Sequence, residues 1–524
     1  MSSAANFADR ARAYPNAGAL VLGAVSATGF APLSLWPLAL LAVGLFAFVV
    51  ARAATIKRAA MAGWLFGLGH FAVGNSWMAN SFKYQDAMPA WLGWLAVLLA
   101  AIYLAVYPAI AAVCTRLVCK SGLTWQFAAI FAAFWTLSEW LRSWAFTGYP
   151  WNPFGAVLVG PFDRTGAAIV LPWTGTYALS GLAVFLGAAA VILFGRRRFP
   201  WLGGAAALLL AAMVWPASAR DEGDLTFTLV QPDLRQQDVN NPATFETQFR
   251  NIATLSLPRD PGQKRLVFWP ESGVPDYLRS GYPQRYYDQM TAAGDPEFAR
   301  QRIGRVIGEG SIVLTGAVDL EIRRGRAAGA RNVVTAMDET GAIIGGYDKA
   351  HLVPYGEYLA LRWLLEPLGA NRLVAGTIDF WPGPGPQTLD LGDMGKIGPQ
   401  ICYEIIFSGH VTDRRNRPDF IFNPSNDGWF GSWGPPQHLA QARMRAIEEG
   451  LPVLRATTTG ISAVIDADGI VRDHIGLQKA GRIDGLIPPP REPTLFARLG
   501  NYLPLGWAFL VLLIAMVAPR FRRG

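Results

Sequence analysis

Three residues suited to nucleophilic chemistry, Glu271, Lys349 and Cys402, each follow a short apolar run. The runs are residues 266–270, 343–348 and 397–401. Such runs predict strands, and the ends of strands are where α/β sheets build their sites. The acid can take the thiol proton, the thiolate can attack a carbonyl carbon, and the ammonium can stabilise the thiolate and the oxyanion. These residue types therefore indicate covalent catalysis without a histidine.

Their position after strands leaves a structural alternative open for each residue. A cysteine after a strand is commonly a small buried hydrophobe. Lys349 also suits a solvated loop, and Glu271 suits a helix cap. The sequence around the three residues decides between these alternatives.

Three segments around these residues resemble the nitrilase superfamily, whose Glu-Lys-Cys triad matches Glu271, Lys349 and Cys402. The segments are Phe268-Trp269-Pro270-Glu271, Tyr347-Asp348-Lys349-Ala350-His351-Leu352-Val353-Pro354-Tyr355-Gly356-Glu357-Tyr358 and Ile401-Cys402-Tyr403-Glu404. Further segments resemble one branch, the bacterial apolipoprotein N-acyltransferases. They are Asn423-Pro424-Ser425-Asn426-Asp427-Gly428-Trp429-Phe430-Gly431 with Gln437, His438 and Arg443, Glu139-Trp140-Leu141-Arg142, and Thr147-Gly148-Tyr149-Pro150-Trp151. The resemblance covers nearly the whole chain.

The resemblance implies transfer of an acyl chain from a phospholipid, typically phosphatidylethanolamine, to the α-amine of the diacylglyceryl-cysteine that begins an apolipoprotein. It implies a thioester on Cys402, with Glu271 as general base and acid. Lys349 and the backbone N–H of Tyr403 would hold the oxyanion. Glu357 would orient Lys349, and Tyr403 and Glu404 would support the nucleophile.

Two other features of the motifs bear on the site. His351 and His438 lie inside these segments and are candidates for a supporting role. After the first predicted strand the family usually has Lys and Trp where this chain has Val239 and Asn240. Because that Trp helps line the family's lipid cavity, the departure bears on acyl-donor preference and not on the reaction class.

The charges divide the chain into two unlike halves. Only four of its 38 acidic residues precede Pro216, and the net charge is +8. The excess of basic residues lies at the ends of apolar runs, as in membrane proteins, which argues against nucleic-acid binding. With three cysteines and no CxxC pair, we expect no disulfide scaffold and no zinc site. We also predict no other metal and no cofactor.

The charge-free runs predict eight membrane spans, since one span needs about 20 residues. Residues 13–51 suffice for two spans with a turn near residues 31–34, and one span each is expected in 59–82, 87–115, 121–138, 165–195, 199–219 and 499–519. Ten Lys and Arg residues fall in the loops on one side and three on the other. This bias predicts that both termini lie inside and residues 218–498 outside. In a bacterium, as the resemblance implies, these sides are the cytoplasm and the periplasm of the inner membrane.

Residues 218–498 read as a layered α/β domain. Strands are expected at 225–230, 265–269, 311–318, 332–336, 343–347, 397–401, 420–423 and 453–457, and a helix at 436–449. The resemblance makes this a nitrilase-like αββα sandwich. The predicted domains are therefore a seven-span domain at 1–217, the catalytic domain at 218–498, and an eighth helix with a basic tail at 499–524.

Three functions compete on these observations. The first is acyl transfer through the Cys402 thioester. The second is a membrane-tethered carbon-nitrogen hydrolase, an amidase with water as acceptor, although one span would suffice as its tether. The third is a transporter or lipid-binding protein in which the nitrilase-like domain is a scaffold. Replacement of the whole triad without loss of function would favour the third.

Overall fold

The computed structural model describes residues 15–84, 89–216, 221–260, 262–365, 367 and 378–521. The chain forms two compact units. One comprises Met1–Ala79, Ala90–Ala217 and Thr494–Gly524, and the other comprises Asn80–Pro89 and Ser218–Pro493. The predicted boundary between residues 217 and 218 lies outside the described residues.

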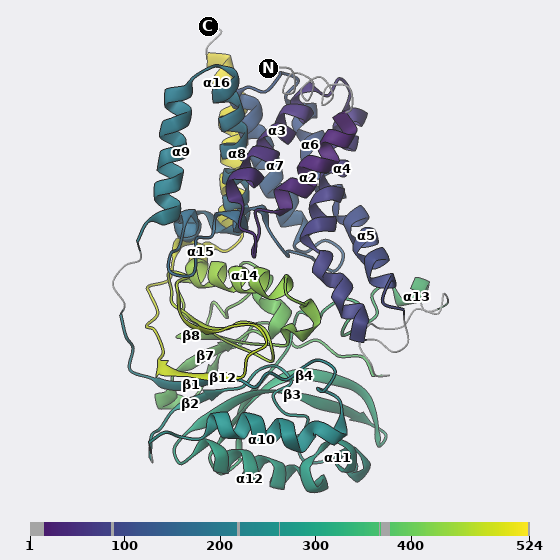
Figure 1. The fold of residues 1–524 in the computed structure, drawn as a ribbon, viewed down its shortest axis with the longest axis vertical. Coiled ribbons are helices and arrows are strands. Elements are labelled where there is room, and N and C mark those ends of the chain that lie inside the picture. The colour runs from purple at the N-terminus through teal and green to yellow at the C-terminus, as the bar shows by residue number, and fades with distance from the viewer. Residues whose placement is uncertain are drawn as a thin grey trace. The chain divides into compact units, whose positions relative to one another are not determined.

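The first unit is helical (Figure 1). Its α-helices are α2 (Pro15–Ala27), α3 (Trp36–Arg52), α4 (Ile56–Gly74), α5 (Leu92–Leu104), α6 (Val106–Val118), α7 (Trp125–Arg142), α8 (Leu171–Gly195), α9 (Phe199–Val214), α15 (Leu495–Leu499) and α16 (Tyr502–Phe521). Thr55 and Thr124 cap α4 and α7 by accepting backbone N–H bonds. Helices α3 and α8 pack closely where Gly44 meets Gly187. A Cβ at position 44 would lie 2.1 Å from the carbonyl oxygen of Gly187, so glycine is needed there.

The predicted spans map onto these helices with three differences. The run 59–82 is α-helical only to Gly74 and continues as the 3₁₀ helix η1 (Ser76–Tyr84). The run 87–115 divides into α5 and α6 at Ala105, and α8 is kinked at Gly175, whose φ is +69°. By length and composition, two stretches of the described residues could cross a membrane, Leu92–Val118 and Ala167–Gly195. The prediction of eight spans is therefore not confirmed by helix length.

The second unit contains two six-stranded sheets (Figure 1). The first has the order β12-β1-β2-β3-β4-β5 and the second the order β11-β10-β9-β8-β7-β6. Their bounds are β1 (Thr226–Gln231), β2 (Leu266–Phe268), β3 (Ile312–Arg323), β4 (Arg326–Asp338), β5 (Ile343–Asp348), β6 (Leu389–Asp390), β7 (Lys396–Pro399), β8 (Phe420–Ser425), β9 (Val453–Thr457), β10 (Ser462–Ile465), β11 (Val471–Ile475) and β12 (Gly481–Leu486). All eight predicted strands are present.

The two sheets face each other across one apolar core. Phe268 of β2 and Leu314 of β3 share this core with Phe422 of β8 and Leu454 of β9. The rings of Phe268 and Phe422 are 4.8 Å apart. Each strand thus buries alternate residues in this core and directs the others away from it.

Helices cover the outer faces of the two sheets. On the first sheet, Ile252 of α10 (Phe245–Ser256) and Ile303 of α12 (Pro296–Ile307) pack against Val267 and Val313. The smaller helices α11 (Gln284–Met290) and α13 (Arg362–Leu365) belong to this unit as well. On the second sheet, α14 (Gly434–Glu449) contacts β9. The unit is therefore a helix–sheet–sheet–helix sandwich, and the predicted helix at 436–449 is present.

Candidate active site

The fold brings the three predicted residues together at one end of the facing sheets. Glu271 follows β2, Lys349 follows β5, and Cys402 begins the 3₁₀ helix η8 (Cys402–Ile406) after β7. All three are buried, with exposed fractions of 8%, 1% and 5%. The Lys349 Nζ lies 2.9 Å from Glu357 Oε1 and 3.5 Å from Glu271 Oε1. Lys349 is therefore an ion-paired group and not a solvated loop lysine.

Two asparagines that the sequence reasoning missed hold the carboxylates in place. Asn332 Nδ2 donates to Glu271 Oε1 at 2.7 Å and to Glu357 Oε1 at 2.9 Å. The backbone N–H of Asn426 donates to Glu271 Oε2 at 2.8 Å. Asn332 is a polar residue in the predicted apolar strand 332–336, and this exception to the pattern was the signal that could have identified it. Lys349 and Asn332 together allow two acids to share one buried site.

The backbone at Cys402 is strained. Cys402 has φ of +50°, in the left-handed region that side chains other than glycine rarely adopt. This conformation costs roughly 1–2 kcal/mol and recurs at functional sites. Here it marks the turn between β7 and η8, and it places the thiol beside the acids and the lysine.

The electrostatics of the site favour a thiol in the resting protein. Burial, followed by the Glu271 carboxylate, raises the pKa of Cys402 above its ordinary value, and Lys349 only partly opposes them. Burial would lower the pKa of Lys349, but Glu357 and Glu271 outweigh it and raise that pKa. Lys349 thus lowers the pKa of Cys402, in the direction that the sequence predicted, but it does not offset burial because its charge is shared with two carboxylates. An attack by Cys402 would therefore need a base for the thiol proton, and the Glu271 carboxylate lies in the same site.

We therefore expect alkylation of Cys402 by iodoacetamide to keep accelerating well above pH 8.5, where an ordinary thiol titrates. A group with a raised pKa stays protonated at neutral pH, so the reactive thiolate grows with rising pH. The pH profile of the alkylation rate measures this, after subtraction of the rate for Cys402→Ala. A plateau between pH 6 and pH 7 would mean a preformed thiolate.

Glu404 joins the two segments that carry Lys349 and Cys402. Its Oε1 accepts from the Tyr347 hydroxyl at 2.8 Å and from the Ala350 N–H at 2.7 Å, and its Oε2 accepts from the Ile401 N–H at 2.8 Å. Burial raises the pKa of Glu404 to about 7. Its neighbour Tyr403 is buried, and its ring meets that of Phe407 edge to face at 5.2 Å. Tyr403 and Glu404, the two predicted supporting residues, thus lie in the same turn as Cys402.

Replacing Glu404 by glutamine is expected to destabilise the second unit by about 2 kcal/mol, because an amide N–H₂ would face N–H and O–H donors in a buried site. Thermal unfolding of the purified protein measures the loss. Glu492→Gln is the matched control, since Glu492 is exposed. Equal midpoints of thermal unfolding for Glu404→Gln and Glu492→Gln would show that Glu404 does not join these segments.

A second buried cluster lies against Cys402, and it contains His438, which the sequence analysis named as a candidate for a supporting role, together with Arg455, which it missed. Asp427, in the 3₁₀ helix η9 (Asp427–Phe430), His438 on α14 and Arg455 on β9 are each no more than 1% exposed. One ligand atom each from Cys402, Asp427 and His438 lie within 4.8 Å of one another, which is a spacing that can hold a metal. However, Arg455 Nη2 lies 2.6 Å from Asp427 Oδ2 and lowers the pKa of that carboxyl despite its burial. The carboxylate is therefore already neutralised by a guanidinium.

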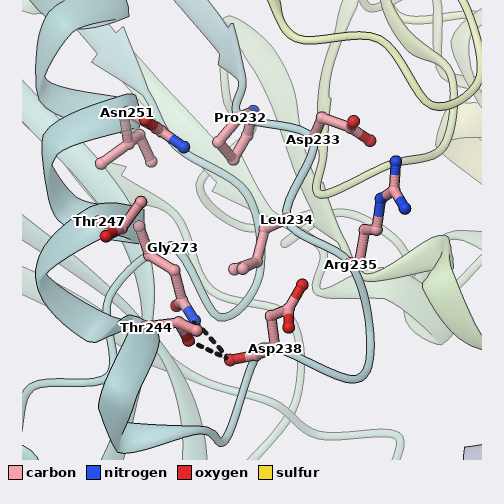
Figure 2. A pocket seen from close by; sticks show the side chains of 11 residues that line it. Pro232, Asp233, Leu234, Arg235, Asp238, Thr244, Thr247, Asn251 and Gly273 are labelled. Atoms are coloured by element: carbon pink, nitrogen blue, oxygen red, sulfur yellow. Dashed lines mark hydrogen bonds between the residues drawn. The ribbon is translucent and has the colours of Figure 1, made fainter.

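The loop after β1, which contains Val239 and Asn240, forms one wall of a small cavity. A cavity of about 160 Å³ lies between the loop after β1 and the start of α10, beside Gly273. Figure 2 shows the Thr244 hydroxyl donating to the Asp238 carbonyl, at 3.1 Å, across the base of this loop. Val239 is partly buried and Asn240 is exposed, so neither fills the position of a buried aromatic side chain.

Comparison with known proteins gives the class of the second unit. Residues 233–485 match the carbon-nitrogen hydrolase family. A carbon-nitrogen hydrolase superfamily protein from Xanthomonas campestris is 20% identical, covers 50% of this chain and 91% of its own, and superposes with a TM-score of 0.34. The second unit is a nitrilase-like carbon-nitrogen hydrolase domain.

The match extends over the helical half. Residues 22–189 match the apolipoprotein N-acyltransferase N-terminal domain. The apolipoprotein N-acyltransferase of Rhodopseudomonas palustris is 35% identical over 525 residues, which span 95% of this chain and 94% of the relative. That of Bradyrhizobium diazoefficiens is 35% identical over 529 residues, 96% of this chain and 94% of the relative. The chain belongs to the apolipoprotein N-acyltransferase family.

Proposed function

We propose that this protein transfers an acyl chain from a phospholipid to the α-amine of the N-terminal S-diacylglyceryl-cysteine of apolipoproteins, the last step of lipoprotein maturation. One observation carries the proposal: relatives named for this activity match both halves over nearly their full length. The buried acid, ammonium and thiol supply the chemistry that such a transfer needs. No cofactor is required.

In the first half-reaction, Cys402 Sγ attacks the ester carbonyl of the donor while Glu271 takes the thiol proton. The Lys349 ammonium and the Tyr403 N–H stabilise the oxyanion. The ester bond breaks, Glu271 returns the proton to the leaving alcohol, and a lysophospholipid departs. Cys402 is left as a thioester.

In the second half-reaction, the α-amine of the acceptor attacks the thioester. Glu271 accepts a proton from the amine, the new amide forms, and the proton returns to the sulfur. Glu357 keeps Lys349 in place, and Tyr403 and Glu404 support the nucleophile. This ping-pong order follows from the covalent thioester, because the lysophospholipid leaves before the amine attacks.

We also propose the membrane arrangement that these lipid substrates need. The protein spans a bacterial inner membrane eight times, with seven spans in 1–217, the periplasmic catalytic domain at 218–498 and the eighth span with a cytoplasmic tail at 499–524. Large apolar side chains exposed on α9 and α16, such as Leu208, Phe509 and Leu513, support lipid contact. Phosphatidylethanolamine is the proposed donor.

The transfer is tested by incubating purified enzyme with phosphatidylethanolamine and a synthetic S-diacylglyceryl-cysteinyl peptide. We expect the peptide to gain one acyl chain in amide linkage, measured by mass spectrometry. The same peptide with an acetylated α-amine is the matched control and should gain nothing. Donor consumption with fatty-acid release and no peptide product, or ammonia release from a small amide, would indicate the hydrolase alternative.

A further inference from the structure

The side chain of His438 contacts the peptide group that follows the nucleophile. Its Nε2 lies 3.1 Å from the carbonyl oxygen of Cys402. His438 is fully buried on α14, and the edge of the Phe430 ring packs against it at 5.8 Å. The acyl-transfer steps described above give His438 no part.

The neighbours of His438 determine which ring nitrogen carries the proton. Arg455 Nη2 lies 3.0 Å from His438 Nδ1, and a guanidinium can only donate. Nδ1 also lies 3.1 Å from Asp427 Oδ1, so it faces both a donor and an acceptor. The Cys402 carbonyl oxygen can only accept, so its 3.1 Å contact with the ring requires the proton on Nε2. Arg455 is held in turn by Asp427 at 2.6 Å and by the Asn423 side chain. Burial and Arg455 also lower the pKa of His438, which keeps the ring neutral.

The bond at the Cys402 carbonyl has a consequence on the other side of the same peptide. The C=O of Cys402 and the N–H of Tyr403 belong to one planar group and point in opposite directions. A donor that fixes the carbonyl therefore fixes the direction of the N–H. It also polarises the amide and makes its N–H a stronger donor.

We propose that His438 is a positioning residue: its Nε2–H orients and polarises the Cys402–Tyr403 peptide so that the Tyr403 N–H stabilises the oxyanion of acyl transfer. Arg455 acts through His438 by donating to Nδ1, and Asp427 acts by holding Arg455 in place. The inference rests on the acyl transfer proposed for Cys402 but not on the identity of the acyl donor. It also accounts for how a cysteine is held in the left-handed conformation at this turn.

Two small reagents separate this role from a general structural one. Acetylation of Cys402 by p-nitrophenyl acetate passes through an oxyanion. Alkylation by iodoacetamide displaces iodide and forms none, although it uses the same thiol. Both are measured in a Cys114→Ala/Cys119→Ala background, in which Cys402 is the only thiol.

His438→Asn and His438→Phe lose the donor at the Nε2 position, whereas His438→Gln retains an N–H there. We expect the donor-less variants to lose at least about 10-fold in acetylation rate, since removal of a whole oxyanion donor costs about 10²–10³-fold. Alkylation should change less than about threefold. His438→Gln should acetylate within about fivefold of the parent.

Equal losses in acetylation and alkylation would show that His438 only supports the fold or the thiol, and unchanged acetylation would show that it has no part in catalysis. If the donor-less variants do not fold, His438→Gln decides alone, because normal alkylation with lost acetylation in that variant would overturn the proposal. The activated ester needs no membrane substrate. A wild-type protein that acetylates normally but takes no acyl chain from phospholipid would therefore refute the proposed function and leave this inference standing.

Discussion

Replacing Glu271 by glutamine is expected to block formation of the acyl-enzyme while leaving the catalytic domain folded. Glu271 is the proposed acceptor for the thiol proton, and burial raises the pKa of Cys402, so the thiol needs a base to attack at neutral pH. Loss of a general base costs about 10²–10⁴-fold in rate. The rate constant of thioester formation, followed by intact-protein mass, measures the loss.

The matched control for this change is Glu321→Gln. Glu321 lies in the same sheet and pairs with Arg331 near the surface, so the same chemical change there should leave acylation intact. Unfolding midpoints of both variants show whether the fold survives. A Glu271→Gln enzyme that acylates at the wild-type rate would remove Glu271 from the mechanism.

The second large effect is expected for Lys349→Met, which should lower acylation by about 10³-fold or more through loss of oxyanion stabilisation. The substitution also leaves Glu271 and Glu357 buried without their shared cation. Breaking a buried ion pair in this way destabilises a protein by about 3–5 kcal/mol. We therefore expect a large fall in the unfolding midpoint as well.

A double variant separates these two losses. Lys349→Met/Glu357→Gln removes one of the uncompensated carboxylates, so it should recover part of the stability without recovering activity. Thermal unfolding and the acylation rate are measured on both variants. Recovery of activity in the double variant would mean that Lys349 serves only to neutralise Glu357.

Most of the strands that the sequence predicted are buried on both faces, and the edge strand β5, with only Tyr347 buried, is the exception. Residues 453–457 form β9 with all five residues buried. The strands it missed lie at or near the sheet edges, where apolar runs are short. Residues 471–475 form β11 with only Val471 buried, and residues 481–486 form β12 with only Ile483 buried. Pairing with a neighbouring strand, which a local pattern does not contain, makes these segments strands.

Some residues of the candidate site could likewise be predicted from the sequence, and others could not. The segments containing Glu271, Lys349 and Cys402 were recognisable, so the three residues could be named in advance. His438 and Arg455 come from a helix and a strand far along the chain, and only folding brings them to the Cys402 peptide. The protonation state of Cys402 depends on burial and on competition for Lys349, neither of which residue types reveal.

In the helical half, the lengths of the charge-free runs predicted where apolar helices lie but not where these helices are interrupted. The interruption at Ala105 and the kink at Gly175 fall inside uniformly apolar runs. Composition cannot tell one long helix from two short ones there. The close packing of Gly44 against Gly187 is likewise a tertiary feature.

Intact-mass analysis of the purified protein after incubation with phosphatidylethanolamine tests the central claim most directly. We predict a mass gain equal to one acyl chain that neutral hydroxylamine removes and that Cys402→Ala does not show. Cys114 and Cys119 remain in that variant, so the absence of a mass gain assigns the thioester to Cys402. A folded wild-type protein without the adduct, or an adduct that persists in Cys402→Ala, would contradict the account.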